Sequence, residues 1–252
     1  MAWDMPTQDC GPCLKVPLDL NAFDVQSSPN EGFVNQNIII FYCNCLGLHP
    51  CFDSAGRSVH GGVPQNGSLW AYLEMLRDHV EHYLWTPEPT GLAVVDWEDW
   101  QPVWNWESYI GHGPDVEVAR NDQLAWLWAN SMALFLSVYL DETFASSAHG
   151  HNFMSFHVQE ALRVAHTHHA NHALPVYVFT WLTYNHRLRE LSEMDLISTI
   201  GESAVLGAAD VILWGNAGYT TSMETCQYLK DYLTGLLVPK VVNVFWATQY
   251  CS

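Results

Sequence analysis

Short apolar runs alternate with longer amphipathic stretches along most of the chain. The apolar runs predict strands at 38–42, 92–96, 137–140, 176–180 and 211–214. The helical spacing of apolar residues predicts helices at 69–83, 122–134, 153–169, 192–206 and 223–236. Ser192 followed by Asp195 is typical of a helix start with an acidic first turn. Because short strands that alternate with helices form parallel sheets, the pattern predicts an α/β fold.

The size and composition of the chain are sufficient for one domain with a hydrophobic core. It has 252 residues, of which 49% are hydrophobic, and this length suits a barrel-sized domain. The longest apolar stretch, 124–140, is interrupted by Asn130, Ser131 and Ser137. It therefore predicts a buried helix followed by a strand and no transmembrane segment.

Two carboxylates follow the predicted strand at 92–96. Asp96 and Glu98 are two residues apart, so on an extended chain they share a face, and Trp97 and Trp100 lie beside them in sequence. A pair of acids at a strand end can supply the proton donor and the charge stabilisation that glycosidic bond cleavage needs. Indole rings suit the apolar face of a sugar. The alternative is a strand that simply ends in solvated acids.

These residues resemble a known family. The segment Asp-Trp-Glu-Asp-Trp at 96–100 resembles the active-site strand of the hyaluronidases, glycoside hydrolase family 56. The sequence is most similar to the hyaluronidase-2 branch of that family. Further similar segments lie along nearly the whole chain, at 3–10, 23–26, 40–42, 61–66, 121–128, 137–140, 212–215 and 224–227. Such long collinear similarity is far more specific than one short motif.

The resemblance implies a fold and a set of roles. The fold would be a TIM-like (β/α) barrel, in which chemistry takes place at the carboxyl ends of the strands. Glu98 would donate a proton to the glycosidic oxygen, and Asp96 would position the substrate's acetamido group, which acts as the nucleophile. Tyr139, Trp214 and Ser137 would bind the substrate. The family implies no cofactor and no metal.

The chain departs from the family pattern at one junction. Trp104 joins directly to Asn105, where the family places a helix and a strand that carries an active-site tyrosine. We therefore expect residues 1–252 to form a single catalytic domain that is internally truncated at 104/105. Because a parallel barrel closes only with a consistent strand number, we expect an incomplete barrel that lacks one strand and its helix.

Cysteine and asparagine positions add further expectations. The resemblance implies a disulfide between Cys10 and Cys226. Asn66 begins a glycosylation sequon, Asn-Gly-Ser. Two possible metal sites are weaker than their alternatives, since neither has a complete ligand set of familiar spacing. They are a zinc site at Cys43, Cys45 and Cys51, and a histidine pair at His168 and His172.

The charge balance is strongly acidic. Nine Lys and Arg residues stand against 27 Asp and Glu residues, which gives a formal net charge of −18. This charge argues against nucleic acid as a partner and slows the approach of a polyanion. Several positions where the resembled pattern has arginine carry another residue here. They are His112, His151, His157, His166 and Trp181. This pattern suggests drift without selection for activity.

Two function classes follow. The first is an endo-β-N-acetylglucosaminidase that hydrolyses hyaluronan, or a related glycosaminoglycan, by a retaining, substrate-assisted mechanism, with impaired activity. The second is an inactive, pseudogene-like remnant or a non-catalytic fragment that binds carbohydrate or a partner. The chain shows no signal-peptide pattern and no anchor signal, whereas the family implies a secretory, lysosomal or cell-surface location.

Overall fold

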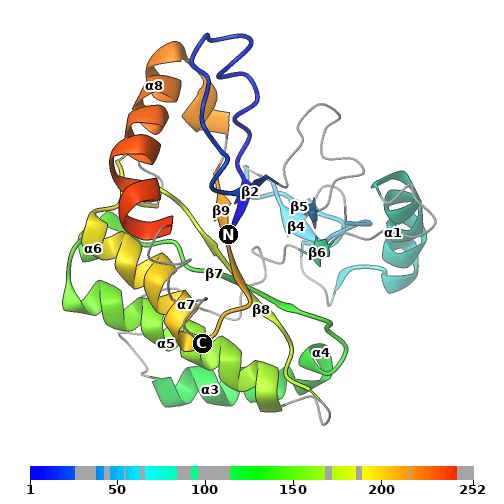
Figure 1. Cartoon of the computed structure of the whole chain (residues 1–252). Coiled ribbons are helices and arrows are strands. Elements are labelled where there is room, and N and C mark those ends of the chain that lie inside the picture. The colour runs from blue at the N-terminus through cyan, green and yellow to red at the C-terminus, as the bar shows by residue number, and fades with distance from the viewer. Residues whose placement is uncertain are drawn as a thin grey trace. The chain divides into compact units, whose positions relative to one another are not determined.

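The computed structural model describes residues 1–25, 38–42, 46–53, 55–62, 66–83, 92–95, 114–167, 172–185, 189–215 and 217–242. The chain divides into two compact units (Figure 1). The first contains Met1–Val25 and Trp104–Ser252, and the second contains Gln26–Val103. Asp96, Glu98, the 104/105 junction, Cys43, Cys45, His112, His168 and Cys251 lie outside the described residues.

A five-stranded parallel sheet forms the centre of the first unit. Its strand order is β2 (Asp24–Val25), β1 (Ala2–Asp4), β9 (Asp210–Trp214), β8 (Val176–Thr180) and β7 (Leu134–Ser137). All four pairings are parallel. Parallel strands need crossover connections, and helices supply them between β7 and β8 and between β8 and β9. The predicted α/β class is therefore confirmed.

Helices cover one face of this sheet. They are α3 (Pro114–Gln123), α4 (Ala125–Trp128), α5 (Ala148–Thr167), α6 (Glu193–Leu196), α7 (Glu202–Leu206) and α8 (Met223–Tyr232). A π-helical segment, Ile197–Gly201, joins α6 to α7, and a second, Leu233–Val242, continues α8. Short 3-10 turns occur at Glu142–Phe144 and Ala217–Thr220. Figure 1 shows α5, α6 and α7 running together beside β7 and β8.

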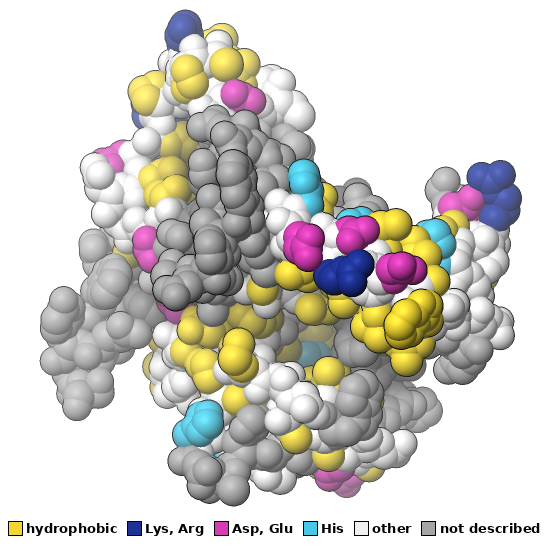
Figure 2. Space-filling view, turned by 90° about the vertical axis from the view of Figure 1, so that its right-hand side faces the viewer, with side chains coloured by type: hydrophobic (Ala, Val, Ile, Leu, Met, Phe, Trp, Pro, Cys, Tyr) yellow, Lys and Arg dark blue, Asp and Glu magenta, His cyan; other side chains and the backbone are white. Residues whose placement is uncertain are grey.

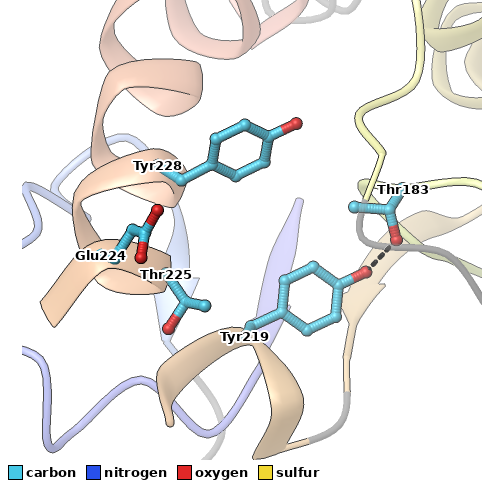
Figure 3. Close-up of a pocket in the computed structure, with 5 residues that line it drawn as sticks. All are labelled: Thr183, Tyr219, Glu224, Thr225 and Tyr228. Carbon is cyan, nitrogen blue, oxygen red and sulfur yellow. Dashed lines mark hydrogen bonds between the residues drawn. The ribbon is translucent and has the colours of Figure 1, made fainter. Parts of the chain in front are cut away.

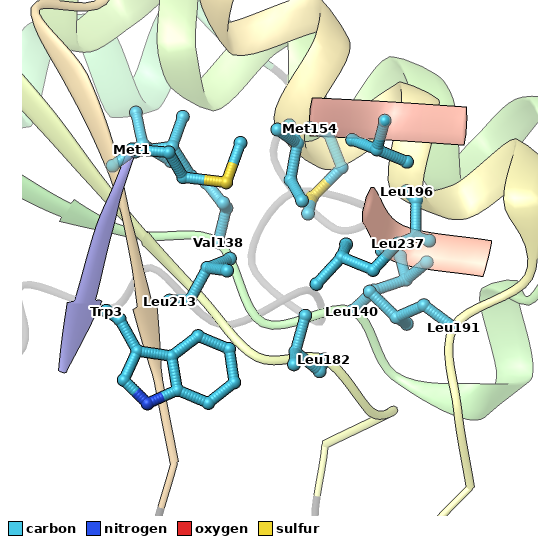
Figure 4. Packing of buried hydrophobic residues seen from close by; sticks show 14 of the residues in the cluster. Met1, Trp3, Val138, Leu140, Met154, Leu182, Leu191, Leu196, Leu213 and Leu237 are labelled. Carbon is cyan, nitrogen blue, oxygen red and sulfur yellow. The ribbon is translucent and has the colours of Figure 1, made fainter. Parts of the chain in front are cut away.

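The main core lies between these helices and one face of the sheet. Every second strand residue points into it, as Trp3, Val138, Val178 and Leu213 do, and each of these is at most 1% exposed. Helix residues such as Met154, Leu196 and Leu237 close the core from the other side (Figure 4). The residues between them on the strands therefore face the opposite side of the sheet.

A disulfide connects the start of the chain to the last helix. Cys10 and Cys226 are joined with an Sγ–Sγ distance of 1.99 Å, as the family resemblance implies, and both are fully buried. Ser222 caps α8 just before the bridge. Its hydroxyl accepts a hydrogen bond from the Thr225 amide, and the Thr225 hydroxyl accepts one from the Ser222 amide. Cys13 and Cys51 are free thiols.

The second unit contains two small sheets and one helix. Parallel strands β3 (Ile38–Phe41) and β6 (Leu92–Val95) pair in register, and β4 (Cys51–Phe52) pairs with β5 (Ser58–Val59) as a hairpin. Helix α1 (Leu69–Tyr83) packs Tyr72, Leu76 and Tyr83 against buried Ile39, Phe41 and Leu46.

The outer side of α1 keeps much apolar surface. Trp70 is 78% exposed and Leu69 is 70% exposed. Figure 2 shows hydrophobic side chains gathered beside charged ones on the face that is turned to the viewer. Asn66 lies exposed just before this helix, where its side chain is accessible. Among the described residues, no helix combines the length and apolar character needed to cross a membrane.

Several predicted boundaries are wrong. The strand expected at 137–140 is Leu134–Ser137, and the helix expected at 122–134 is instead α3 and α4, which end at Trp128. Pro114 begins α3, because proline fits the first turn of a helix, so the chain is already helical well before the expected start at residue 122. Helix α5 starts at Ala148, where the Ser147 hydroxyl accepts a hydrogen bond from the Gly150 amide.

Candidate active site

Four strands of the first unit place one residue each in a row at their carboxyl ends. Asp4 on β1 is the register partner of Trp214 on β9. Thr180 pairs with Leu213 and Phe179 pairs with Ser137, so Trp181 is level with Trp214 and Tyr139 is level with Trp181. The row Asp4–Trp214–Trp181–Tyr139 therefore crosses the sheet on the face opposite the helix-covered core.

The three aromatic residues of this row contact one another. The ring centroids of Tyr139 and Trp181 are 5.4 Å apart, those of Trp181 and Trp214 are 5.4 Å apart, and those of Tyr139 and Trp214 are 6.2 Å apart. Tyr139 and Trp214 are half-buried, whereas Trp181 is buried. Trp181 thus supports the other two rings from within, and they offer an aromatic surface of the kind that packs against the apolar face of a sugar.

Ser137 shares this face with Tyr139. The two residues are separated by Val138, whose side chain points into the core and whose backbone amide donates to the Phe179 carbonyl at 2.9 Å. The ladder thus continues past the end of β7 and keeps Ser137 and Tyr139 on one side. Ser137 is exposed. The three residues expected to bind substrate, Ser137, Tyr139 and Trp214, therefore share one face of the sheet.

Asp4 is an acid of this row that sequence reasoning missed. Its side chain is 6% exposed, and among the described residues none forms a hydrogen bond or ion pair with its carboxylate. Burial raises the pKa of Asp4 from 3.8 to about 7. The signal was present, since an acid that ends an apolar strand is the pattern that singled out Asp96. The strand is only three residues long, which is too short to recognise from local sequence.

The acid pair follows a strand of the second unit. β6 ends at Val95, one residue before Asp96, and it is held in register by β3 over four residue pairs. Asp96 and Glu98 themselves lie outside the described residues, so their roles stay predictions.

The fold also bears on the two candidate metal sites. Across the described segments, no three His, Cys, Asp or Glu side chains are grouped closely enough to hold a metal ion. Of the two candidate ligand sets, only Cys51 and His172 belong to those segments.

Comparison with known proteins places the chain in a family. The family model described as hyaluronidase matches residues 1–108 and 105–252. Hyaluronidase-2 of Homo sapiens is 62% identical over 329 aligned positions, which include 100% of this chain and 70% of the human protein. Hyaluronidase-2 of Mus musculus is 55% identical, with the same coverage. Hyaluronidase-1 of Bitis arietans is 30% identical and covers 99% of this chain and 73% of its own length.

Solved structures agree on the fold. Bee venom hyaluronidase in a monoclinic crystal form gives a TM-score of 0.70 at 20% identity. The same enzyme in complex with a hyaluronic acid tetramer gives 0.76 at 21% identity. Both alignments cover 96% of this chain and 98% of the solved chain. The family model, which matches from the first residue to the last, and the 62% identity to human hyaluronidase-2 show that the chain belongs to the hyaluronidase family of glycoside hydrolases.

Proposed function

We propose that this protein hydrolyses hyaluronan as an endo-β-N-acetylglucosaminidase. The observation that carries the proposal is the joint placement of Ser137, Tyr139 and Trp214 on one face at the carboxyl ends of neighbouring parallel strands. In barrels built of βα units, this end of the strands is where substrates bind. Membership of the hyaluronidase family and the hyaluronic acid tetramer bound by its bee venom relative support the same substrate.

The reaction would proceed with retention of configuration. Glu98 donates a proton to the glycosidic oxygen, and the carbonyl oxygen of the substrate's own acetamido group attacks the anomeric carbon as the leaving sugar departs. Asp96 positions and stabilises the acetamido nitrogen, which becomes positively charged. Glu98 then removes a proton from water, and the water oxygen opens the cyclic intermediate at the anomeric carbon.

The binding residues would act on the acetamido sugar. The Tyr139 hydroxyl donates a hydrogen bond near the acetamido carbonyl, and the Trp214 ring packs on the sugar. Trp181 packs between these two rings, and its ring centroid is 5.4 Å from each of theirs. A secretory, lysosomal or cell-surface location belongs to the same proposal, because the Cys10–Cys226 disulfide suits an oxidising compartment.

The decisive experiment measures reducing ends released from hyaluronan at acidic pH. The parent protein should release them, and Glu98→Gln should lose about two orders of magnitude or more in rate. Glu81→Gln is the matched control, because Glu81 is an exposed residue on α1. Release by the parent that Glu98→Gln does not reduce would disprove the assignment.

A non-catalytic function is the second candidate, and a specific observation favours it. The alignment with human hyaluronidase-2 spans 329 positions, whereas this chain has 252 residues, so at least 77 positions have no counterpart here. The family model matches in two parts that meet at residues 105–108, beside the 104/105 junction. Binding of hyaluronan fragments without any reducing-end release would support this second function.

A further inference from the structure

A pocket lies beside the aromatic row in the first unit. It has a volume of about 180 Å³ and is lined by Thr183, Tyr219, Glu224, Thr225 and Tyr228. Glu224, Thr225 and Tyr228 come from α8, Tyr219 comes from the 3-10 turn before it, and Thr183 follows β8 (Figure 3). Three separate segments thus converge on one cavity.

The base of the pocket is rigidly held. Tyr219 is 5% exposed, and its hydroxyl shares a short hydrogen bond with the hydroxyl of Thr183, which is 3% exposed. Gly215 allows the Tyr219 ring to approach, since a Cβ at that position would lie 2.9 Å from the ring. The capped start of α8 and the disulfide at Cys226 fix the opposite wall.

The mouth of the pocket is aromatic. Tyr228 is 45% exposed, so one part of its ring is open to a ligand. With the Tyr219 ring at the base, the pocket offers two aromatic surfaces, and such surfaces suit the apolar C–H faces of a sugar or the methyl of an acetamido group.

The charges around the pocket select against an anion. Glu224 lines it, and a second acid, Glu190, lies close enough to Tyr228 for the two side chains to interact. None of the five lining residues is basic. The nearby Arg189 is engaged by Glu142 and packs over the Tyr184 ring at 5.6 Å. A uronate carboxylate would therefore be repelled, whereas sugar hydroxyls and an amide N–H can donate to the Glu224 carboxylate.

The size of the cavity limits the ligand to one ring. Its volume of about 180 Å³ lies below the range of roughly 300–1,000 Å³ that is usual for sites of drug-sized ligands. The pocket also adjoins the candidate active site. The Tyr219 ring packs edge-on against Trp181 with 6.5 Å between the ring centroids, and the centroids of Trp181 and Tyr139 are 5.4 Å apart. A glycan seated at the aromatic row could thus extend one sugar into this pocket.

We propose that the pocket is an accessory subsite that binds one neutral N-acetylhexosamine unit of a glycan. Its link to catalysis rests on the proposed function, whereas sugar binding in the pocket does not. The Tyr228 and Tyr219 rings contact the apolar parts of the sugar, and Glu224 accepts hydrogen bonds from its hydroxyl or amide groups.

The test is a titration of the full chain with methyl N-acetylglucosaminide, followed by protein-observed NMR. The parent should bind this sugar at millimolar concentration and should bind methyl glucuronide at least about fivefold more weakly. Tyr228→Ala and Glu224→Gln should each weaken binding of the neutral sugar about fivefold. Met223→Ala, at a 61% exposed position of the same helix, and Glu81→Gln should leave it within about twofold.

Thermal unfolding of each variant separates lost binding from lost folding. If Tyr228→Ala does not fold, Tyr228→Leu and Glu224→Gln decide the result. Equal binding of both sugars, or unchanged binding in the folded variants, overturns the subsite. Reducing-end release from hyaluronan is measured in parallel: binding without release leaves the subsite standing and contradicts the proposed function, whereas release without binding contradicts only the subsite.

Discussion

Asp4 and Trp214 are register partners at the carboxyl ends of β1 and β9, so a buried acid stands directly beside a half-buried indole. The two residues come from segments that are 210 positions apart in the numbering of the chain. Their pairing joins the start of the chain to the aromatic row at Tyr139, Trp181 and Trp214. Burial at this position raises the pKa of Asp4 to about 7.

Asp4 makes the stability of the first unit depend on pH. The pKa of Asp4 is about 7 in the folded protein, whereas its ordinary value is 3.8. Between pH 3.8 and pH 7 the folded state therefore binds more protons than the unfolded state does. The free energy of unfolding therefore falls as pH rises from about 4 to about 7. Asp4→Asn should remove this loss of stability. The loss amounts to as much as about 4 kcal/mol, because each pKa unit of difference between the folded and unfolded states corresponds to about 1.36 kcal/mol.

Thermal or urea unfolding at pH 4 and pH 7 measures this effect. Asp24→Asn is the control, because Asp24 lies on the neighbouring strand β2 and is exposed. The parent should lose more stability between the two pH values than Asp4→Asn does. The same pH dependence in the parent and in Asp4→Asn would show that the Asp4 carboxyl does not titrate in this range.

The hydroxyl of Tyr139 should matter for catalysis and little for packing. Tyr139→Phe keeps the ring contacts with Trp181 and Trp214 but removes the hydrogen-bond donor. We expect kcat on hyaluronan to fall about tenfold to a hundredfold, less than the roughly hundredfold or greater loss on removing an oxyanion donor, because the acetamido oxygen gains no negative charge as it attacks. Tyr177→Phe is the matched control, because Tyr177 lies on the same face near the other end of β8. Equal losses in both variants would remove Tyr139 from the site.

Trp214 should contribute to substrate binding. Trp214→Leu removes an aromatic surface on which the sugar packs. We expect KM for hyaluronan to rise about tenfold, which corresponds to a loss of roughly 1.4 kcal/mol of binding free energy. Because Trp214 also contacts Trp181, near-UV circular dichroism should be compared with that of the parent. An unchanged KM in a folded variant would contradict the role.

The Cys10–Cys226 disulfide should stabilise the protein by restricting the unfolded chain. It joins residues 216 positions apart, and in the chain-entropy account a loop of this length is worth about 5 kcal/mol. The double variant Cys10→Ser/Cys226→Ser should lose this stability in urea unfolding. Cys13→Ser, at an exposed free thiol, should not. Peptide mapping without reductant that finds Cys10 chiefly bonded to Cys13 would refute the pairing.

The 104/105 junction should weaken the cooperativity of unfolding. At least 77 positions of human hyaluronidase-2 have no counterpart in this chain, since 252 residues align over 329 positions. If a strand and helix of the barrel are among them, apolar surface is left uncovered. We expect a broad thermal transition and binding of a hydrophobic dye by the native protein. A sharp transition without dye binding, together with strong hyaluronan cleavage, would show that the barrel tolerates the deletion.

Local sequence determined much of the framework. The apolar runs at 176–180 and 211–214 became β8 and β9, because short β-rich runs bounded by polar residues have few other ways to be buried. Ser192 caps α6 through the Asp195 amide, as the sequence predicted, since capping depends on residues only three apart. The boundaries around β7 were wrong because apolar residues at 124–140 fit a helix or a strand equally well.

Tertiary structure alone decided which side chains meet. Asp4, Trp214, Trp181 and Tyr139 belong to four strands, and nothing near any of them in sequence specifies the register that aligns them. The pocket at Tyr219 and Tyr228 likewise needs Thr183 from a distant loop. Local propensity acts over a few residues, whereas strand pairing and burial depend on contacts across the whole chain. The raised pKa of Asp4 follows from that burial, so it could not be foreseen from the sequence.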